Sequence, residues 1–239
     1  MPLIIRNFTS LLIVLSLLPI GCDNSRNVKS TGIAPMQNNS FEYLTTENLG
    51  DFKWLNEPRS FELNNGILKV IAEKETDFFN NPEDHKKTAT APMLYKELKG
   101  DFVAKALVRP DFSSLWNAVA LMVHIDNDNW IKFAFENSDA TGRSIVSVVT
   151  KKTSDDANGV ILKDQDQIWL KLVRKDNNYS MLWSKNGKEY KMTRLSTLPK
   201  VDSVKMGIEV QSPVGASATH EIVYFEIEKT TVKDLRKGE

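Results

Sequence analysis

The chain has 239 residues, of which 41% are hydrophobic, 9% aromatic and 26% charged. This composition is typical of a folded domain and not of a disordered or fibrous chain. Lys and Arg total 31, as do Asp and Glu, so the formal net charge is zero and a nucleic-acid partner is not expected. One Cys and three His are too few for a zinc cluster or a disulfide framework.

Residues 1–21 have the pattern of a secretory signal. Arg6 is their one charged side chain. The apolar run over 11–18 is shorter than the ~20 residues that a membrane-spanning helix needs. A positive start, an apolar middle and a small residue before the cut point, here Gly21, are typical of such signals. We therefore expect residues 1–21 to be a cleaved lipoprotein signal peptide.

Cys22 is the only cysteine of the chain and directly follows the predicted cut point. In this position it resembles the residue at which a bacterial lipoprotein is cut and lipidated. The resemblance implies a cell-envelope protein that is anchored to a membrane by acyl chains on Cys22, at the outer membrane or the periplasmic face. Residues 22–40 are polar and lack apolar periodicity, so we expect a tether there. An ordinary secreted protein with a stray cysteine is the alternative.

From about residue 41 onward, side chains alternate with period two. The alternation is clearest over 102–109, 118–125, 130–136 and 168–173. Successive side chains of a strand point to opposite faces, so each apolar set can line a core. About a dozen such strands predict an all-β fold, one antiparallel β-sandwich over residues 41–229. The polar C-terminal tail, 230–239, is expected to fray.

Several segments, taken in order, resemble the YesU and regulation-of-enolase type family of unknown function. They are Trp54-Leu55-Asn56-Glu57-Pro58, Thr76-Asp77-Phe78-Phe79, Gly100-Asp101-Phe102, the run from Asn129 to Glu136, and Ser147-Val148-Val149-Thr150 with Ser154-Asp155. The resemblance covers about 48–228 and implies a concanavalin A-like jelly roll. This chain has Phe79 and Asp156 where the family usually carries Trp, and both positions lie in segments expected to be loops that hold a ligand.

The hairpin around residues 126–129 carries the candidate ligand-binding side chains. Ile131, Phe133 and Phe135 are expected to face the core, which leaves the opposite face to the other set. That set consists of His124, Trp130, Lys132 and Glu136. Neighbouring alanines leave room, the Trp offers an apolar plate, and the other three can bond sugar hydroxyls on the concave face of a jelly roll. The alternative is a partly buried Trp beside a solvated Lys–Glu pair.

Catalytic residues cannot be assigned in the same way. Glycoside hydrolases use two carboxyl groups about 5–10 Å apart, and Glu136 has no acidic neighbour at the alternating positions of its own strand. Glu221 and Glu226 are five residues apart, so strict alternation places them on opposite faces. Asp155 and Asp156 are expected in a loop from which they could approach Glu136.

Residues 126–129 offer four oxygen-bearing side chains to a calcium ion, but a tight turn uses the same residue types. We interpret them as a turn and expect no metal and no cofactor, because phosphate-loop and dinucleotide motifs are also missing. The sequence favours a non-catalytic carbohydrate-binding module with a glycan or oligosaccharide partner. The alternatives are a glycoside hydrolase-like enzyme of the same fold and an envelope protein-interaction domain.

Overall fold

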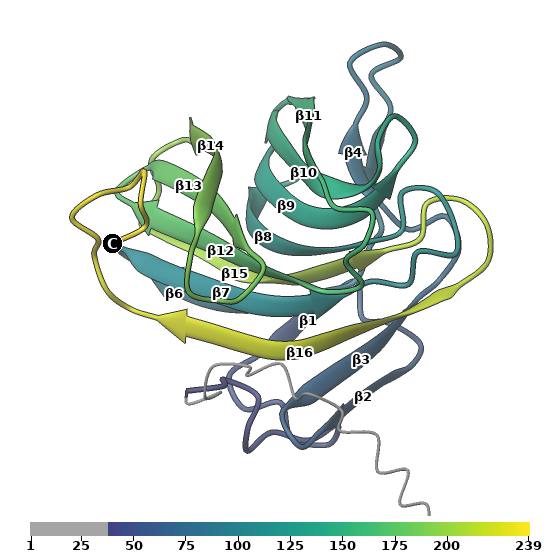
Figure 1. The fold of residues 1–239 in the computed structure, drawn as a ribbon, viewed down its shortest axis with the longest axis horizontal. Helices are drawn as coiled ribbons and strands as arrows, with labels where there is room; N and C mark the ends of the chain where they lie inside the picture. The colour runs from purple at the N-terminus through teal and green to yellow at the C-terminus, as the bar shows by residue number, and fades with distance from the viewer. Residues whose placement is uncertain (1–37) are drawn as a thin grey trace, which may run out of the picture. The chain divides into compact units, whose positions relative to one another are not determined.

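The computed structural model describes residues 38–239. The predicted signal peptide, Cys22 and nearly all of the predicted tether lie outside the described residues. Within the described part, no helix is long and apolar enough to cross a bilayer. The described residues form strands, which pair antiparallel into two large sheets and one small hairpin (Figure 1).

The first sheet has the strand order β1-β6-β15-β8-β9-β10-β11. Its strands are β1 (Lys53–Leu55), β6 (Met93–Lys99), β15 (Ser203–Gln211), β8 (Ala118–Asp126), β9 (Asn129–Ser138), β10 (Gly142–Lys151) and β11 (Thr153–Ile161). The second sheet has the order β14-β13-β12-β7-β16-β3-β2. Its strands are β14 (Lys191–Thr197), β13 (Asn178–Ser184), β12 (Ile168–Lys175), β7 (Phe102–Arg109), β16 (Ala218–Glu228), β3 (Ile67–Ala72) and β2 (Phe61–Asn64).

The core between the two sheets follows the predicted alternation. On β9, Ile131, Phe133 and Phe135 are fully buried in this core together with apolar side chains of β7, β12 and β16. Trp130 and Lys132 point to the opposite face of the same strand, because successive residues of a strand alternate. The predicted all-β sandwich and the side-chain parity of β9 are therefore confirmed.

Strand β16 departs from strict alternation. A β-bulge between Ile222 and Tyr224 inserts one residue opposite β7, so the parity of the strand changes there. As a result Glu221 pairs with Arg109 and Glu226 with Lys105, and both glutamates lie on the outer face of the second sheet. The expectation that they point to opposite faces is wrong, because it assumed an unbroken two-residue alternation and the sequence does not show where a bulge interrupts it.

The C-terminal tail is also ordered against this outer face, contrary to the expectation that it frays. Val232 is buried against Val103, Val173 and Leu182. The Lys175 ammonium donates to the Val232 carbonyl at 2.7 Å. The apolar contacts of Val232 and Leu235 hold this otherwise polar segment against the second sheet.

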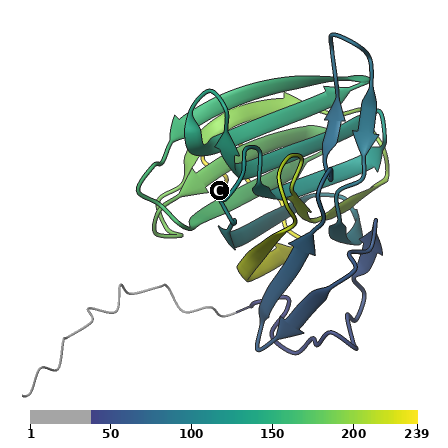
Figure 2. The ribbon, with the colours of Figure 1, turned by 90° about the vertical axis from the view of Figure 1, so that its right-hand side faces the viewer.

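The small hairpin consists of β4 (Phe78–Asn80) and β5 (Lys87–Ala89), and it lies on the outer face of the first sheet beside β10 and β11 (Figures 1 and 2). Asn80 attaches it there. Its backbone N–H donates to the Ser154 hydroxyl, and its side-chain amide donates to the carbonyls of Asn127 and Lys152 at 2.9 and 3.0 Å. This hairpin covers part of a sheet face that the sequence pattern alone would leave open to solvent.

Candidate functional site

The outer face of the first sheet, under the β4–β5 hairpin, is lined by small residues at its centre. Ala118, Ala120 and Ala134 form a cluster of their own on β8 and β9. The register places Lys132 beside Val148 of β10, and Val148 beside Asp156 of β11. The three alanines are buried, and longer polar side chains such as Lys132 and Glu136 project from the same face.

A cavity of about 340 Å³ lies on this face of the sheet, a volume at the small end of the range of ligand pockets. We call it the sheet-face cavity. It is lined by Asp77, Phe79, Asn81, Trp116, Lys132, Glu136, Asp139, Val148, Asp156 and Gln211. The lining side chains come from the first sheet, from the hairpin region and from the loops on either side, so the site needs segments that are distant in the sequence.

Lys132 is the hub of the cavity wall. It is buried, and its ammonium donates to the Asp77 carboxylate at 2.9 Å, the Phe78 carbonyl at 3.0 Å and the Gln211 side-chain oxygen at 2.6 Å. The negative charge of Asp77 keeps the pKa of Lys132 above its ordinary value despite the opposing effect of burial, so the group stays charged. The three contacts tie β9 to the hairpin and to β15.

Trp116 supplies the exposed aromatic surface of the cavity. Its side chain is 37% exposed, and its backbone has a φ of 60°, a left-handed conformation that is uncommon for a bulky residue. The backbone is held on both sides. The Trp116 N–H donates to the Asn137 carbonyl at 2.8 Å, and the Gln211 amide donates to the Trp116 carbonyl at 2.7 Å. Strained backbone that is fixed in this way is concentrated at functional sites.

Glu136 is the most deeply buried carboxyl of the cavity lining, with 6% exposure. Burial is the largest cause that raises its pKa, to about 8, against the lowering effect of Lys132. The negative charges of Asp156 and Asp77 raise it further. The carboxyl is therefore mostly protonated at neutral pH and can donate as well as accept a hydrogen bond.

Glu209 lies on β15 below the cavity and is fully buried. Neither of its carboxyl oxygens has a hydrogen-bond partner among the described residues. Burial raises its pKa to about 8, although Lys132 acts in the opposite direction. Glu209 thus adds a second protonated acid to this part of the sheet at neutral pH.

Two of the four predicted ligand-binding residues, Lys132 and Glu136, line the cavity. Trp130 does not, and the exposed plate predicted for it is wrong, because its side chain is fully buried with its ring edge-on to Phe78 at a centroid distance of 6.0 Å. His124 is also buried, with its Nε2 3.3 Å from the Asn127 side-chain oxygen. Burial lowers the pKa of His124. Both rings contact Phe78 of β4, so Trp130 and His124 support the hairpin from beneath.

The sequence analysis named Asp155 and Asp156 as residues that could approach Glu136, but it placed them in the wrong kind of element. Asp155 and Asp156 lie on strand β11 and not in a loop, and Asp156 lines the cavity. Asp77 and Gln211 reach the site from segments that show no pattern in common with β9. A lone Trp in the polar loop between two strong strands was the one available signal for Trp116, since loops on rigid scaffolds carry much binding function.

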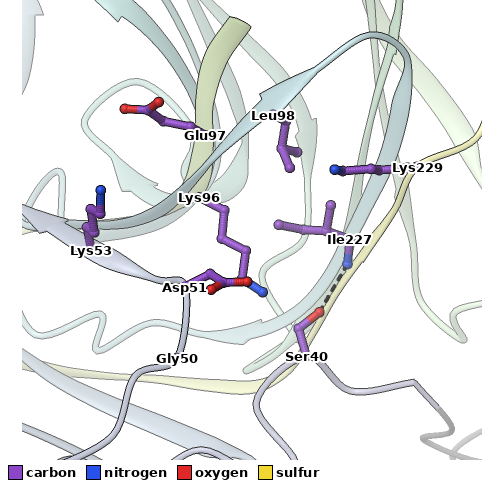
Figure 3. Close-up of a pocket in the computed structure, with 9 residues that line it drawn as sticks. All are labelled: Ser40, Gly50, Asp51, Lys53, Lys96, Glu97, Leu98, Ile227 and Lys229. Atoms are coloured by element: carbon purple, nitrogen blue, oxygen red, sulfur yellow. Dashed lines mark hydrogen bonds between the residues drawn. The ribbon is translucent and has the colours of Figure 1, made fainter.

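A second and larger cavity of about 580 Å³ lies at the ends of β1, β6 and β16 (Figure 3). Apart from half-buried Lys96, its charged lining residues, among them Lys53, Glu97 and Lys229, are exposed. Ser40 closes one side by accepting a hydrogen bond from the Ile227 N–H at 3.3 Å. It is a surface groove without a buried polar group, so the sheet-face cavity is the better candidate for a specific site.

The two-sheet sandwich is a jelly-roll fold shared with solved glycoside hydrolase and lectin chains. The GH43 BlXynB protein from Bacillus licheniformis has a TM-score of 0.60 and 15% identity, and the match covers 81% of this chain and 39% of that one. The Ca²⁺/Man3GlcNAc-bound exoplasmic/lumenal domain of VIP36 has a TM-score of 0.52 and 9% identity, with 80% and 89% coverage. At these identities the likeness shows the fold alone.

The chain belongs to the family of proteins of unknown function DUF1349, whose model matches residues 54–230. It is 26% identical to Regulation of enolase protein 1 of Saccharomyces cerevisiae over 154 residues, and this match covers 64% of this chain and 77% of that protein. A solved, functionally unknown protein from the same yeast has a TM-score of 0.72 and 22% identity, with 76% and 98% coverage. The family resemblance inferred from the sequence is thereby confirmed.

Proposed function

We propose that this protein is a carbohydrate-binding domain and that the sheet-face cavity is its binding site. The observation that carries the proposal is the combination of an exposed, backbone-fixed Trp116 ring with inward-facing polar groups in one cavity. Sugar rings have apolar faces and a rim of hydroxyls, so an aromatic plate beside carboxyl and amide groups suits them. The lectin-like and glycosidase-like fold neighbours are in keeping with this choice.

Affinity electrophoresis and calorimetry with a panel of soluble glycans test the proposal on the purified protein. We expect at least one glycan to bind, and we expect Trp116→Ala to weaken that binding at least tenfold. Tyr43→Ala is the matched control, because Tyr43 is an aromatic residue with 87% exposure that does not line the cavity. The proposal fails if no glycan binds, or if the two variants bind equally well.

A glycoside hydrolase is the second candidate, and the carboxyl groups of the cavity favour it. Glu136, with its raised pKa, has the property of a general acid, and Asp77 and Asp156 line the same cavity. This arrangement supplies the second carboxyl that the sequence pattern of β9 lacks. Release of reducing ends from a bound glycan, abolished by Glu136→Gln with binding retained, would favour hydrolysis over binding alone.

We further propose that Cys22 is lipidated and anchors the domain to a membrane of the bacterial envelope. The support for this is the order of the N-terminal sequence, in which an apolar run and a small residue precede the only cysteine. Acylation would hold the cavity at the envelope, where glycans are present. A purely protein-binding role at the same location is the remaining alternative, and the glycan panel distinguishes it.

A further inference from the structure

The ammonium of Lys132 has no hydrogen-bond donor to spare for a ligand. A lysine ammonium carries three N–H groups, and three protein acceptors lie at 2.6 to 3.0 Å from the Lys132 nitrogen. Lys132 is also the one basic residue among those that line the cavity. The sheet-face cavity therefore contains a cation that organises its wall but offers no free cationic donor to an anionic ligand.

The acidic groups of the cavity, in contrast, have acceptor capacity to spare. The Glu136 side chain is more than nine-tenths buried and faces the cavity, yet no described residue hydrogen-bonds to its carboxyl. Asp139 and Asp156 lie on the same lining. Because this side chain lines the cavity and no described residue donates to its carboxyl, a ligand in the cavity can supply the donor.

The charges around Glu136 specify what kind of donor fits. The groups that act on it are Lys132 from its own strand, Asp77 from the hairpin side, Asp156 from β11 and Glu209 from β15. Four carboxyl groups, counting Glu136 itself, therefore share one cation that is already bound. Glu136 and Glu209 are mostly protonated at neutral pH, but the aspartates that line the cavity outnumber Lys132, so the cavity disfavours an anionic ligand. A cationic ligand would instead stabilise the ionised form of Glu136.

We propose that the sheet-face cavity binds an amino sugar, whose protonated amine lies against Glu136 and whose ring packs on Trp116. This inference rests on the proposed carbohydrate-binding function and names its ligand class. The amine supplies the donor that Glu136 lacks, and the positive charge favours the ionised carboxylate. Because Glu136 is mostly protonated in the free protein below its raised pKa, its ionisation on binding frees one proton, which passes to a neutral amine or, when the amine arrives already protonated, to solvent.

Three oligosaccharides of equal length and linkage test the inference by calorimetry at pH 5.5, where both the chitosan amines and the Glu136 carboxyl of the free protein are protonated. They are chitosan oligomers with free amines, chitin oligomers with acetylated amines, and cello-oligomers with hydroxyls at the same carbon. We expect the chitosan oligomer to bind at least tenfold more tightly than the other two. Titrations in two buffers of different ionisation enthalpy should show proton release with chitosan and none with the cello-oligomer.

The variant Glu136→Gln should remove both the preference for the amine and the proton release. Its matched control is Glu97→Gln, since Glu97 is exposed and lines the other cavity. If Glu136→Gln does not fold, Asp156→Asn on the exposed edge strand provides the second variant and should reduce the preference. Equal or tighter binding of the neutral oligomers would overturn the amine assignment and leave the carbohydrate function standing. A complete lack of binding by all glycans would instead overturn the proposed function.

Discussion

Lys132 shows how one buried charge can organise a binding surface. Its three acceptors belong to the hairpin region and to β15, and Gln211 continues the chain of hydrogen bonds to the Trp116 carbonyl. A buried cation is tolerated when it is paired and its donors are bound, and removal of one partner leaves the others uncompensated. The position of Trp116 in the cavity therefore depends on a lysine that the ligand does not need to touch.

We expect Lys132→Met to destabilise the protein by about 3 kcal/mol, because the Asp77 carboxylate and the Gln211 oxygen lose their donor. Urea unfolding measures the loss. The matched control is Lys87→Met, whose ion pair with Asp128 is half-exposed, and this change should cost less than about 1 kcal/mol. Equal losses in the two variants would show that the buried pair has no special role.

Glu209 predicts how stability changes with pH. Its pKa is raised to about 8 in the folded protein, so between the ordinary value of 4.5 and 8 the native state binds more protons than the unfolded state. Stability therefore falls as pH rises through this window, by up to about 1.4 kcal/mol per pH unit for one such group. Below pH 4.5 both states are protonated and the contribution is constant.

The variant Glu209→Gln keeps the volume and an unpartnered polar group but removes the titration. Urea midpoints from pH 5 to 8 should decline less steeply in this variant than in the native protein, with the difference growing toward pH 8. Glu62→Gln is the control, because Glu62 is an exposed residue of β2. Parallel pH profiles for all three proteins would contradict the assignment of a neutral buried acid.

The sequence was informative about side-chain direction and uninformative about what covers a side chain. Period two placed Trp130, Lys132 and Glu136 on the face opposite Phe133, and the structure agrees. It gave no sign that Phe78 would cover Trp130, because that contact joins residues that are far apart in the chain. The exposed aromatic role passes to Trp116, in a loop that period-two alternation does not describe.

At the scale of elements, the strands that the alternation predicts are present. The site is completed by segments that the alternation does not predict, namely the β4–β5 hairpin and the loop that carries Trp116. β7, β8, β9 and β12 match the four predicted strands within a few residues. The β4–β5 hairpin is three residues on each side, too short for a periodic signal, yet it forms one wall of the cavity. Short elements held by side-chain hydrogen bonds therefore lie beyond what periodicity can reveal.

The attachment of this hairpin can be tested at Asn80. We expect Asn80→Ala to remove two hydrogen bonds to backbone carbonyls and to loosen the hairpin, at a cost of about 1–3 kcal/mol. Hydrogen exchange of peptides that cover 77–91 should speed up while the strands of the core stay protected. Asn48→Ala serves as the control, since the exposed Asn48 side chain accepts a hydrogen bond from the Gly50 N–H at the surface. Unchanged exchange over 77–91 would show that other contacts hold the hairpin.

At the scale of the molecule, charge balance conceals local charge. The sequence is neutral overall, which argues against a nucleic-acid partner, but net charge does not show how the acids are distributed. The fold gathers Asp77, Glu136, Asp139 and Asp156 on one cavity with a single basic residue. Selectivity for a ligand therefore arises from the arrangement of strands and loops, which net charge and composition do not encode.

The anchoring proposal gives the last prediction, and it concerns the whole chain. If acyl chains on Cys22 hold the protein at a membrane, each buried methylene contributes about 0.8 kcal/mol, and two or more chains retain it stably. We expect Cys22→Ser to move the protein from the membrane fraction of its native host to the soluble fraction and to abolish the incorporation of labelled palmitate. Ser25→Ala, three residues further along, should leave both unchanged. Membrane retention of Cys22→Ser at the native level would remove lipidation as the anchor without affecting the cavity or its proposed ligand.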